Sequence, residues 1–152
     1  MNFDIMTLKD GKPFCISYIH DEYCWHYNGK RIVLPKYNPN YPVFIAVGTN
    51  YICVIGVEEN ASFIPYDLKV YNFTGDYLWN VGDIARSISP RMDAFVSIVM
   101  HTKETLTKPP WAVLFGSCTL DDSHEYLTAY DGGEEWLFDI TDRKCLKRVF
   151  TK

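Results

Sequence analysis

The sequence predicts an all-β domain built mainly from antiparallel hairpins, with at most one short helix. Three observations support this fold class: short runs rich in β-branched and aromatic residues recur along the chain, most neighbouring runs are separated by a glycine-containing turn, and apolar residues at helical spacing occur in one segment. A chain of 152 residues that is 47% hydrophobic can bury a core of its own. We therefore expect a single β-rich domain over residues 1–152, arranged as a sandwich, a barrel or a partial propeller-like stack.

Four short β-like runs open the chain and pair into two hairpins. The first pair is separated by Asp10-Gly11 and the second by Asn28-Gly29. Asp-Gly and Asn-Gly supply the positive φ angles of a tight two-residue turn, so both dipeptides are strong hairpin signals. The four expected strands are residues 3–8, 14–19, 23–27 and 31–34.

A polar, proline-containing connection over residues 35–42 separates these hairpins from two more. Turns are expected at residues 48–50 and 74–76, and residues 58–65 form a surface loop between the two hairpins. The four expected strands are residues 43–47, 51–57, 68–73 and 77–81.

Residues 84–99 carry two competing signals. Five apolar residues fall at helical spacing, yet Pro90 interrupts them and residues 95–100 have a high β propensity. Asp83 is placed to cap a helical turn that reaches Ser87. We therefore expect a short helix followed by a strand.

Two further strand pairs complete the chain. Residues 111–119 are expected to pair with residues 125–130 across a polar loop. Residues 135–140 are then expected to pair with residues 145–150. The whole chain would hold roughly eleven to thirteen strands and very little helix.

Three of the hairpins share an aromatic residue, a turn glycine and then an apolar strand, around Gly29, Gly75 and Gly132. This order is similar to that of the outer hairpins of β-propeller blades. The glycines are unevenly spaced, and the Gly-His and Trp-Asp signatures of repeated blades are missing. A partial propeller-like stack is the arrangement that this similarity implies.

The cysteines are odd in number, widely spaced and include no Cys-x-x-Cys pair. Most lie within apolar β-like runs, so we expect reduced core residues rather than disulfides. A metal site would have to start from Cys24 and His26 on one strand face, joined by Cys15 or His20. Because zinc sites usually show a second ligand pair at recognisable spacing, we expect no metal. The cysteines are Cys15, Cys24, Cys53, Cys118 and Cys145.

No motif of a common enzyme class is present: the sequence lacks the nucleophile elbow, the P-loop and the Gly-x-Gly-x-x-Gly fingerprint. His20 and His124 each lie beside carboxylates, which would raise the pKa of the imidazole and could orient it. An exposed polar loop explains the same pattern, since a catalytic site also needs a pocket and a second partner. We therefore expect no enzyme activity and no cofactor.

Apolar runs in this chain are too short to cross a membrane, because a spanning helix needs ~18 or more such residues. The first residues also lack the basic and apolar regions of a secretory signal. We therefore expect a cytoplasmic protein with no membrane partner.

Charge is unevenly distributed near the C-terminus. Residues 111–142 contain eight acidic residues and no Lys or Arg, whereas residues 143–152 contain five basic residues. With a net charge of −4, the chain is not expected to bind nucleic acid, which requires a positive surface. An acidic surface with exposed Tyr126, Tyr130 and Trp136 would suit a basic protein partner, although a solvated acidic face explains the same charges. The eight acidic residues are Asp121, Asp122, Glu125, Asp131, Glu134, Glu135, Asp139 and Asp142.

Small size, acidic balance, aromatic β hairpins and missing catalytic motifs together resemble the immunity proteins of bacterial toxin-immunity pairs, including those of contact-dependent growth inhibition. The resemblance implies a protein that binds one cognate toxin domain, often a basic nuclease, and blocks its active site. We expect the acidic hairpins to imitate phosphates, with Trp136 or Tyr126 as a central anchor. Rival interpretations are a self-associating structural β module and a hydrolase or transferase built on the histidines. The expected partner-binding residues are Asp121, Asp122, Glu125, Tyr126, Asp131, Glu134, Glu135 and Trp136.

Overall fold

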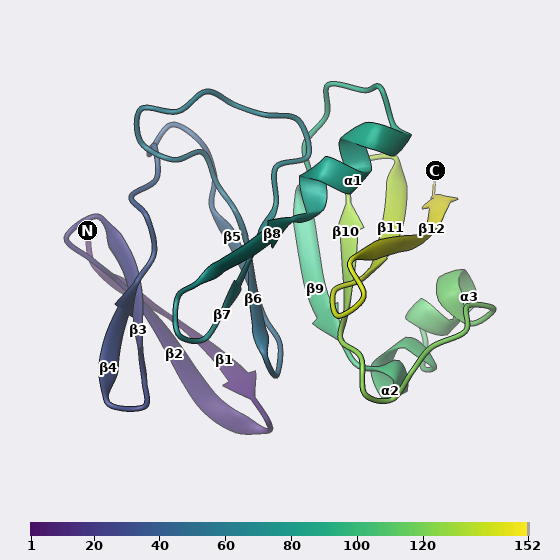
Figure 1. Cartoon of the computed structure of the whole chain (residues 1–152), viewed down its shortest axis with the longest axis horizontal. Coiled ribbons are helices and arrows are strands. Elements are labelled where there is room, and N and C mark those ends of the chain that lie inside the picture. The colour runs from purple at the N-terminus through teal and green to yellow at the C-terminus, as the bar shows by residue number, and fades with distance from the viewer. Residues whose placement is uncertain (152) are drawn as a thin grey trace.

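Three four-stranded antiparallel sheets make up most of the computed structural model, which describes residues 1–151 (Figure 1). Within each sheet the strands are neighbours in the same order as in the sequence. The twelve strands within residues 1–151 confirm the predicted all-β class, although three short helices are present where at most one was expected.

The first sheet is formed by the two hairpins with the strongest turn signals. Asp10 and Gly11 turn the first hairpin with φ angles of 54° and 74°. Asn28 and Gly29 turn the second with φ angles of 51° and 76°, as the two dipeptides predict. The strands are β1 (Phe3–Lys9), β2 (Lys12–Ile19), β3 (Glu22–Tyr27) and β4 (Lys30–Val33).

The second sheet contains the third and fourth predicted hairpins. Gly75 turns the latter with a φ angle of 88°, so both the turn and its flanking strands are confirmed. The first and second sheets are joined where the indole Nε1 of Trp25 donates a hydrogen bond of 2.9 Å to the carbonyl oxygen of Phe73. The strands are β5 (Phe44–Val47), β6 (Tyr51–Ile55), β7 (Lys69–Asn72) and β8 (Tyr77–Asn80).

The third sheet contains the last predicted hairpin as β11 and β12. In the same sheet, β10 lies between β9 and β11. Tyr126 of β10 is paired with His101 of β9 and Asp139 of β11. Our prediction that residues 111–119 pair with the strand that begins at residue 125 is therefore wrong. The strands are β9 (Ser97–His101), β10 (Tyr126–Tyr130), β11 (Glu134–Asp139) and β12 (Lys144–Phe150).

Helix α3 (Trp111–Phe115) lies where a strand was expected, and a further short helix, α2 (Lys103–Leu106), lies in a segment for which no element was predicted. Trp111, Leu114 and Phe115 are three and four residues apart, so on a helix they share one face, which packs against the third sheet. Burial of this apolar face overrides the β propensity of the segment, and propensity alone could not distinguish the two structures.

Helix α1 (Val81–Ile88) confirms the predicted helix but not its cap. The Asn80 side chain accepts hydrogen bonds from the backbone N–H groups of Gly82 (2.8 Å) and Leu68 (3.1 Å). Asp83 lies inside the first turn and forms an ion pair of 2.6 Å with Arg86. The helix therefore begins three residues earlier than predicted, and its cap also fixes the start of β7.

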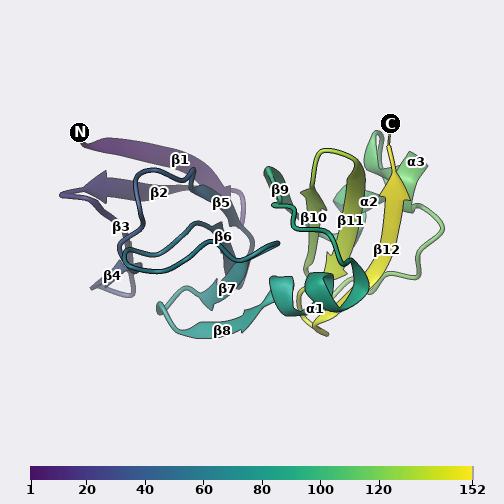
Figure 2. The same cartoon turned by 90° about the horizontal axis from the view of Figure 1, so that it is seen from above.

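The three sheets are stacked in sequence order, with the helices on and beside the third sheet (Figure 2). The first strands of the sheets lie together, because β1 contacts β5 and β5 contacts β9. Within residues 1–151 no sheet closes into a barrel. The barrel, one of the three predicted arrangements, is therefore not observed, and three separate four-stranded sheets are present instead.

The second sheet is covered on both faces, which explains its nearly continuous apolar strands. In β6, Ile52 and Val54 pack toward the first sheet, whereas Cys53 and Ile55 pack toward the third. A third apolar cluster lies between the third sheet and helices α2 and α3, and its buried members are Leu106, Phe115, Tyr126 and Leu137.

Replacement of Asn80 by Ala should lower the free energy of unfolding by about 1–3 kcal/mol, because two backbone donors lose their acceptor. Replacement of Asp83 by Ala removes only a solvent-exposed ion pair and should cost a few tenths of a kcal/mol. Urea denaturation measures both values. Equal effects of the two substitutions would contradict the assignment of Asn80 as the cap.

Candidate functional site

The acidic residues of the segment 121–142 do not form one continuous surface. Some are buried or bound by neighbouring groups, and others are exposed. The carboxylates therefore differ in their contacts, and only some of them can contribute to a binding surface.

Glu125 is a buried link between the second and third sheets. Its carboxylate accepts hydrogen bonds from the backbone N–H of Thr49 (2.7 Å) and from the backbone N–H (3.0 Å) and side-chain amide (2.9 Å) of Asn50. These donors belong to the turn between β5 and β6, whereas Glu125 directly precedes β10. Glu125 therefore stabilises the fold, and the expectation that it faces a partner is wrong.

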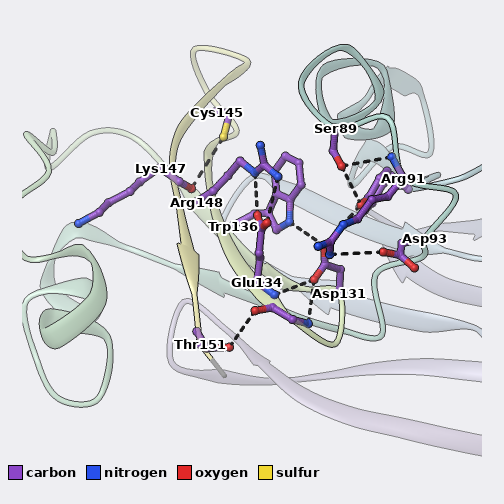
Figure 3. A network of polar contacts seen from close by, with 12 residues as sticks. Ser89, Arg91, Asp93, Asp131, Glu134, Trp136, Cys145, Lys147, Arg148 and Thr151 are labelled. Atoms are coloured by element: carbon purple, nitrogen blue, oxygen red, sulfur yellow. Dashed lines mark hydrogen bonds and ion pairs between the residues drawn. The ribbon is translucent and has the colours of Figure 1, made fainter.

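Asp131 and Glu134 are also held within the third sheet (Figure 3). The Asp131 carboxylate accepts hydrogen bonds from the backbone N–H of Glu134 (2.7 Å) and from Nε1 of Trp136 (3.1 Å). Glu134 forms an ion pair with Arg148, which bonds both carboxylate oxygens at 2.7 and 3.1 Å. Both carboxylates thus have their strongest partners inside the chain.

The expected aromatic anchors Trp136 and Tyr126 are buried, with 0% and 1% of their surfaces exposed. Trp136 packs against Phe138 in the core between the second and third sheets. Tyr126 lies on the opposite face, beneath helices α2 and α3. The expectation that these rings are exposed is wrong, because the third sheet is covered on both faces and has no fully solvated side. Tyr130 is half-buried.

Asp121 and Asp122 are exposed, as expected, in the loop before β10. Nearby, Nδ1 of His124 lies 2.8 Å from Oδ2 of Asp139, and the carboxylate of Asp142 lies 3.8 Å from the same nitrogen. The hydrogen bond to Asp139 is the main cause of a raised His124 pKa. His124, Asp139 and Asp142 could offer three ligand atoms within 4.8 Å of one another, but their mutual contacts already account for the arrangement.

Glu135 differs from the other acidic residues because it lies in a groove beside α3. The groove has a volume of about 510 Å³. Strand alternation places Glu135 and Leu137 on the face of β11 that is covered by α2 and α3, opposite Trp136. The α3 groove is lined by Pro110, Trp111, Val113, Leu114, Tyr130, Glu135 and Thr151.

The Glu135 carboxylate is half-buried and, within residues 1–151, forms no hydrogen bond or ion pair. Its apolar surroundings raise the pKa of this carboxyl from 4.5 to about 7, and the negative charge of Asp131 contributes to the same shift. Water still reaches the Glu135 oxygens, since they are not among the fully buried polar atoms without a partner. Among the predicted partner-binding residues, Glu135 is the one that combines partial burial with the absence of a bonding partner within residues 1–151.

A second hollow, of about 370 Å³, lies between the loops at the end of the second sheet. Tyr41 and Phe63 form part of its wall. Its one charged lining residue, Asp67, is bound by Lys69 at 3.5 Å and by the side-chain amide of Asn80. The hollow therefore offers an apolar surface, whereas the α3 groove also offers an unsatisfied charge.

The four histidines lie on different elements: His20 in the turn between β2 and β3, His26 on β3, His101 at the end of β9 and His124 before β10. His101 is buried and bonded by Thr128 (2.9 Å), and burial lowers its pKa to about 4. In the described part of the chain no hydrogen bond joins two histidines.

All five cysteines are free thiols, in agreement with the predicted reduced state. Cys24 and Cys53 are buried, while Cys15, Cys118 and Cys145 are partly exposed. Cys24 and His26 belong to no group of three potential metal ligands within residues 1–151. None of the five thiols is among the residues that line the α3 groove.

Replacement of Glu125 by Gln should lower the free energy of unfolding by about 1.5–3 kcal/mol, because a neutral amide cannot accept from all three donors. Gly48→Ala should also destabilise the chain, since a Cβ atom there would lie 2.3 Å from the Glu125 carboxylate. Urea denaturation measures both, and the exposed Glu59→Gln is the matched control, expected within about 0.5 kcal/mol of the original chain. If Glu125→Gln were as stable as this control, Glu125 would not link the sheets.

Comparison with protein-family models, with curated proteins and with solved structures found no match in any of the three. None of the helices in residues 1–151 is long and apolar enough to cross a membrane. The chemistry of the α3 groove is therefore the main guide to function.

Proposed function

We propose that this chain is an immunity-type inhibitor that binds a cognate toxin domain with a basic surface and blocks that toxin. The observation that carries the proposal is the half-buried, unpartnered carboxylate of Glu135 in the α3 groove. A basic group of a protein partner would supply the missing counter-charge, and the apolar walls would exclude water from the pair.

The charge distribution supports a basic partner. Asp121, Asp122 and Asp142 remain exposed near one end of the third sheet, and the chain carries a net charge of −4. Exposed charges of one sign accelerate the encounter with a partner of opposite charge. The half-buried carboxylate of Glu135 would then contribute to the lifetime of the complex rather than to its rate of formation.

A second candidate function is a self-associating structural module. In the first sheet, Met6 and Leu8 on the edge strand β1 are 64% and 62% exposed, and Val33 on the opposite edge strand β4 is also exposed. Exposed apolar side chains near an unpaired strand edge favour association. Immunity-type binding is preferred because Glu135 indicates a partner of specific charge, whereas these apolar side chains have no such feature.

The immunity proposal predicts a stoichiometric, salt-sensitive complex with the basic protein encoded by the neighbouring gene, and protection of cells that produce that protein. In this complex Glu135→Gln should weaken binding by about thirtyfold or more, because loss of one member of a buried charge pair costs roughly 2–5 kcal/mol. Isothermal titration calorimetry at two salt concentrations measures the affinity.

Glu59→Gln is again the matched control, since it removes an exposed carboxylate from a loop distant in sequence from the acidic segment. Equal affinities of the Glu135→Gln and Glu59→Gln variants would remove the α3 groove from the interface. A chain that forms only dimers or larger assemblies, with no complex and no protection, would favour the structural module.

A further inference from the structure

We propose that the α3 groove binds an arginine side chain of the protein partner, with Glu135 as the counter-ion and with Trp111 and Tyr130 as aromatic walls. This inference rests on the proposed function and specifies what the partner must present to the groove.

The charged groups around Glu135 leave its negative charge uncompensated. Asp131, on the neighbouring turn, adds further negative charge. On β12, Lys147 donates to the Leu114 carbonyl oxygen at 3.0 Å, and Arg148 is paired with Glu134. Helix α3 carries no charged residue. The two β12 cations Lys147 and Arg148 are therefore already engaged, and the groove favours an external cation.

The face of the sheet on which Arg148 lies explains why its guanidinium does not compensate the charge of Glu135. Arg148 is paired with Trp136 across the β11–β12 ladder, and its guanidinium lies 4.4 Å from the Trp136 ring centroid. Glu135 is paired with Val149 instead and belongs to the opposite face of the sheet. The third sheet itself therefore separates Arg148 from the carboxylate in the groove.

The lining of the groove favours a guanidinium over an ammonium or a metal ion. A guanidinium is weakly hydrated, stacks on aromatic faces and can bond both oxygens of one carboxylate. A lysine ammonium is a strongly hydrated point charge, which suits an apolar groove less well. A divalent cation such as calcium or magnesium would require several oxygen ligands, whereas Glu135 is the single carboxylate among the lining residues.

The groove is accessible to a long side chain from outside. Val113 at its rim is 84% exposed, whereas Leu114 on the next position of α3 is only partly exposed. A side chain with an apolar stem and a charged tip matches this gradient from open rim to half-buried carboxylate. The main chain of the partner would remain outside, against α3 and the end of β12.

Binding of arginine by this groove must depend on pH, because Glu135 has to be ionised to act as a counter-ion. Its pKa of about 7 implies that the carboxyl is mostly protonated near pH 6 and mostly ionised near pH 8. Affinity for a cation should therefore rise by about tenfold across this interval. Asp121, Asp122 and His124 precede β10, at the Tyr126 end of that strand. The groove is lined by Tyr130 at the other end of β10, so these groups do not line it.

The test is an NMR titration of the full ¹⁵N-labelled chain with three acetylated and amidated tripeptides: Gly-Arg-Gly, Gly-Lys-Gly and Gly-citrulline-Gly. Citrulline preserves the shape of arginine and removes the charge. We expect the arginine peptide to shift the Trp111 indole and Thr151 amide signals, with the citrulline and lysine peptides bound at least about tenfold more weakly. Glu135→Gln should abolish the preference, and Glu59→Gln should preserve it.

Equal binding of the arginine and citrulline peptides, or an unchanged preference in Glu135→Gln, would overturn the inference. Equal binding of the lysine peptide would overturn the assignment to arginine. If the partner complex forms but no arginine preference is found, the inference fails and the proposed function stands. If the arginine preference is found without a protein complex, the groove is a guanidinium site and the proposed function fails.

Discussion

The buried carboxylate of Glu125 fixes the second sheet against the third, and the rest of the structure depends on that junction. The Glu125 carboxylate bonds the backbone of the β5–β6 turn and so fixes the position of the start of β10 relative to that turn. Strand β9, which pairs with β10, contacts β5. The apolar cluster that contains Trp136 and Phe138 can then close between the two sheets. Gly48 must remain glycine for the same reason, since the carboxylate occupies the space of its missing side chain.

Glu125 and Glu135 show how the same side chain can serve two purposes in one sheet. Glu125 directly precedes β10 and is buried, whereas Glu135 lies on β11 and is half-buried. Glu125 is satisfied by three donors, so its burial stabilises the fold. Glu135 has no such donors within residues 1–151, and its partial burial leaves a charge that a bound cation would compensate. A protein that retains such a carboxylate at an accessible groove is better suited to binding than to stability.

Local signals in the sequence predicted most of the hairpins. Asp10-Gly11 and Asn28-Gly29 define their turns through backbone conformation alone, and no distant residue is needed to recognise them. The segment at Trp111 could not be predicted in the same way, because its helical form depends on a sheet face that other strands supply. The cap of α1 was missed because the Asn80 side chain also accepts a hydrogen bond from the backbone N–H of Leu68, twelve residues away, and the local sequence does not reveal this contact.

The candidate site was predictable in charge but not in geometry. The acidic character of the segment from Asp121 to Asp142 is plain in the sequence. The sequence does not reveal that Glu125 bonds Asn50, or that Glu134 rather than Glu135 is paired with Arg148. Trp136 was mistaken for a surface residue because its neighbours are acidic, whereas its burial follows from a sheet that is covered on both faces.

The central claim is that Glu135 is an unpartnered carboxylate in an apolar groove, and its own titration tests that claim most directly. A ¹³C NMR titration of the side-chain carboxyl of Glu135, with Glu59 as an internal reference, gives the pH midpoint of each group. We expect a Glu135 midpoint near 7, well above the ordinary value of 4.5. A midpoint near 4.5 would show that the carboxylate is solvated or already paired, and would contradict the assignment of the α3 groove as a binding site.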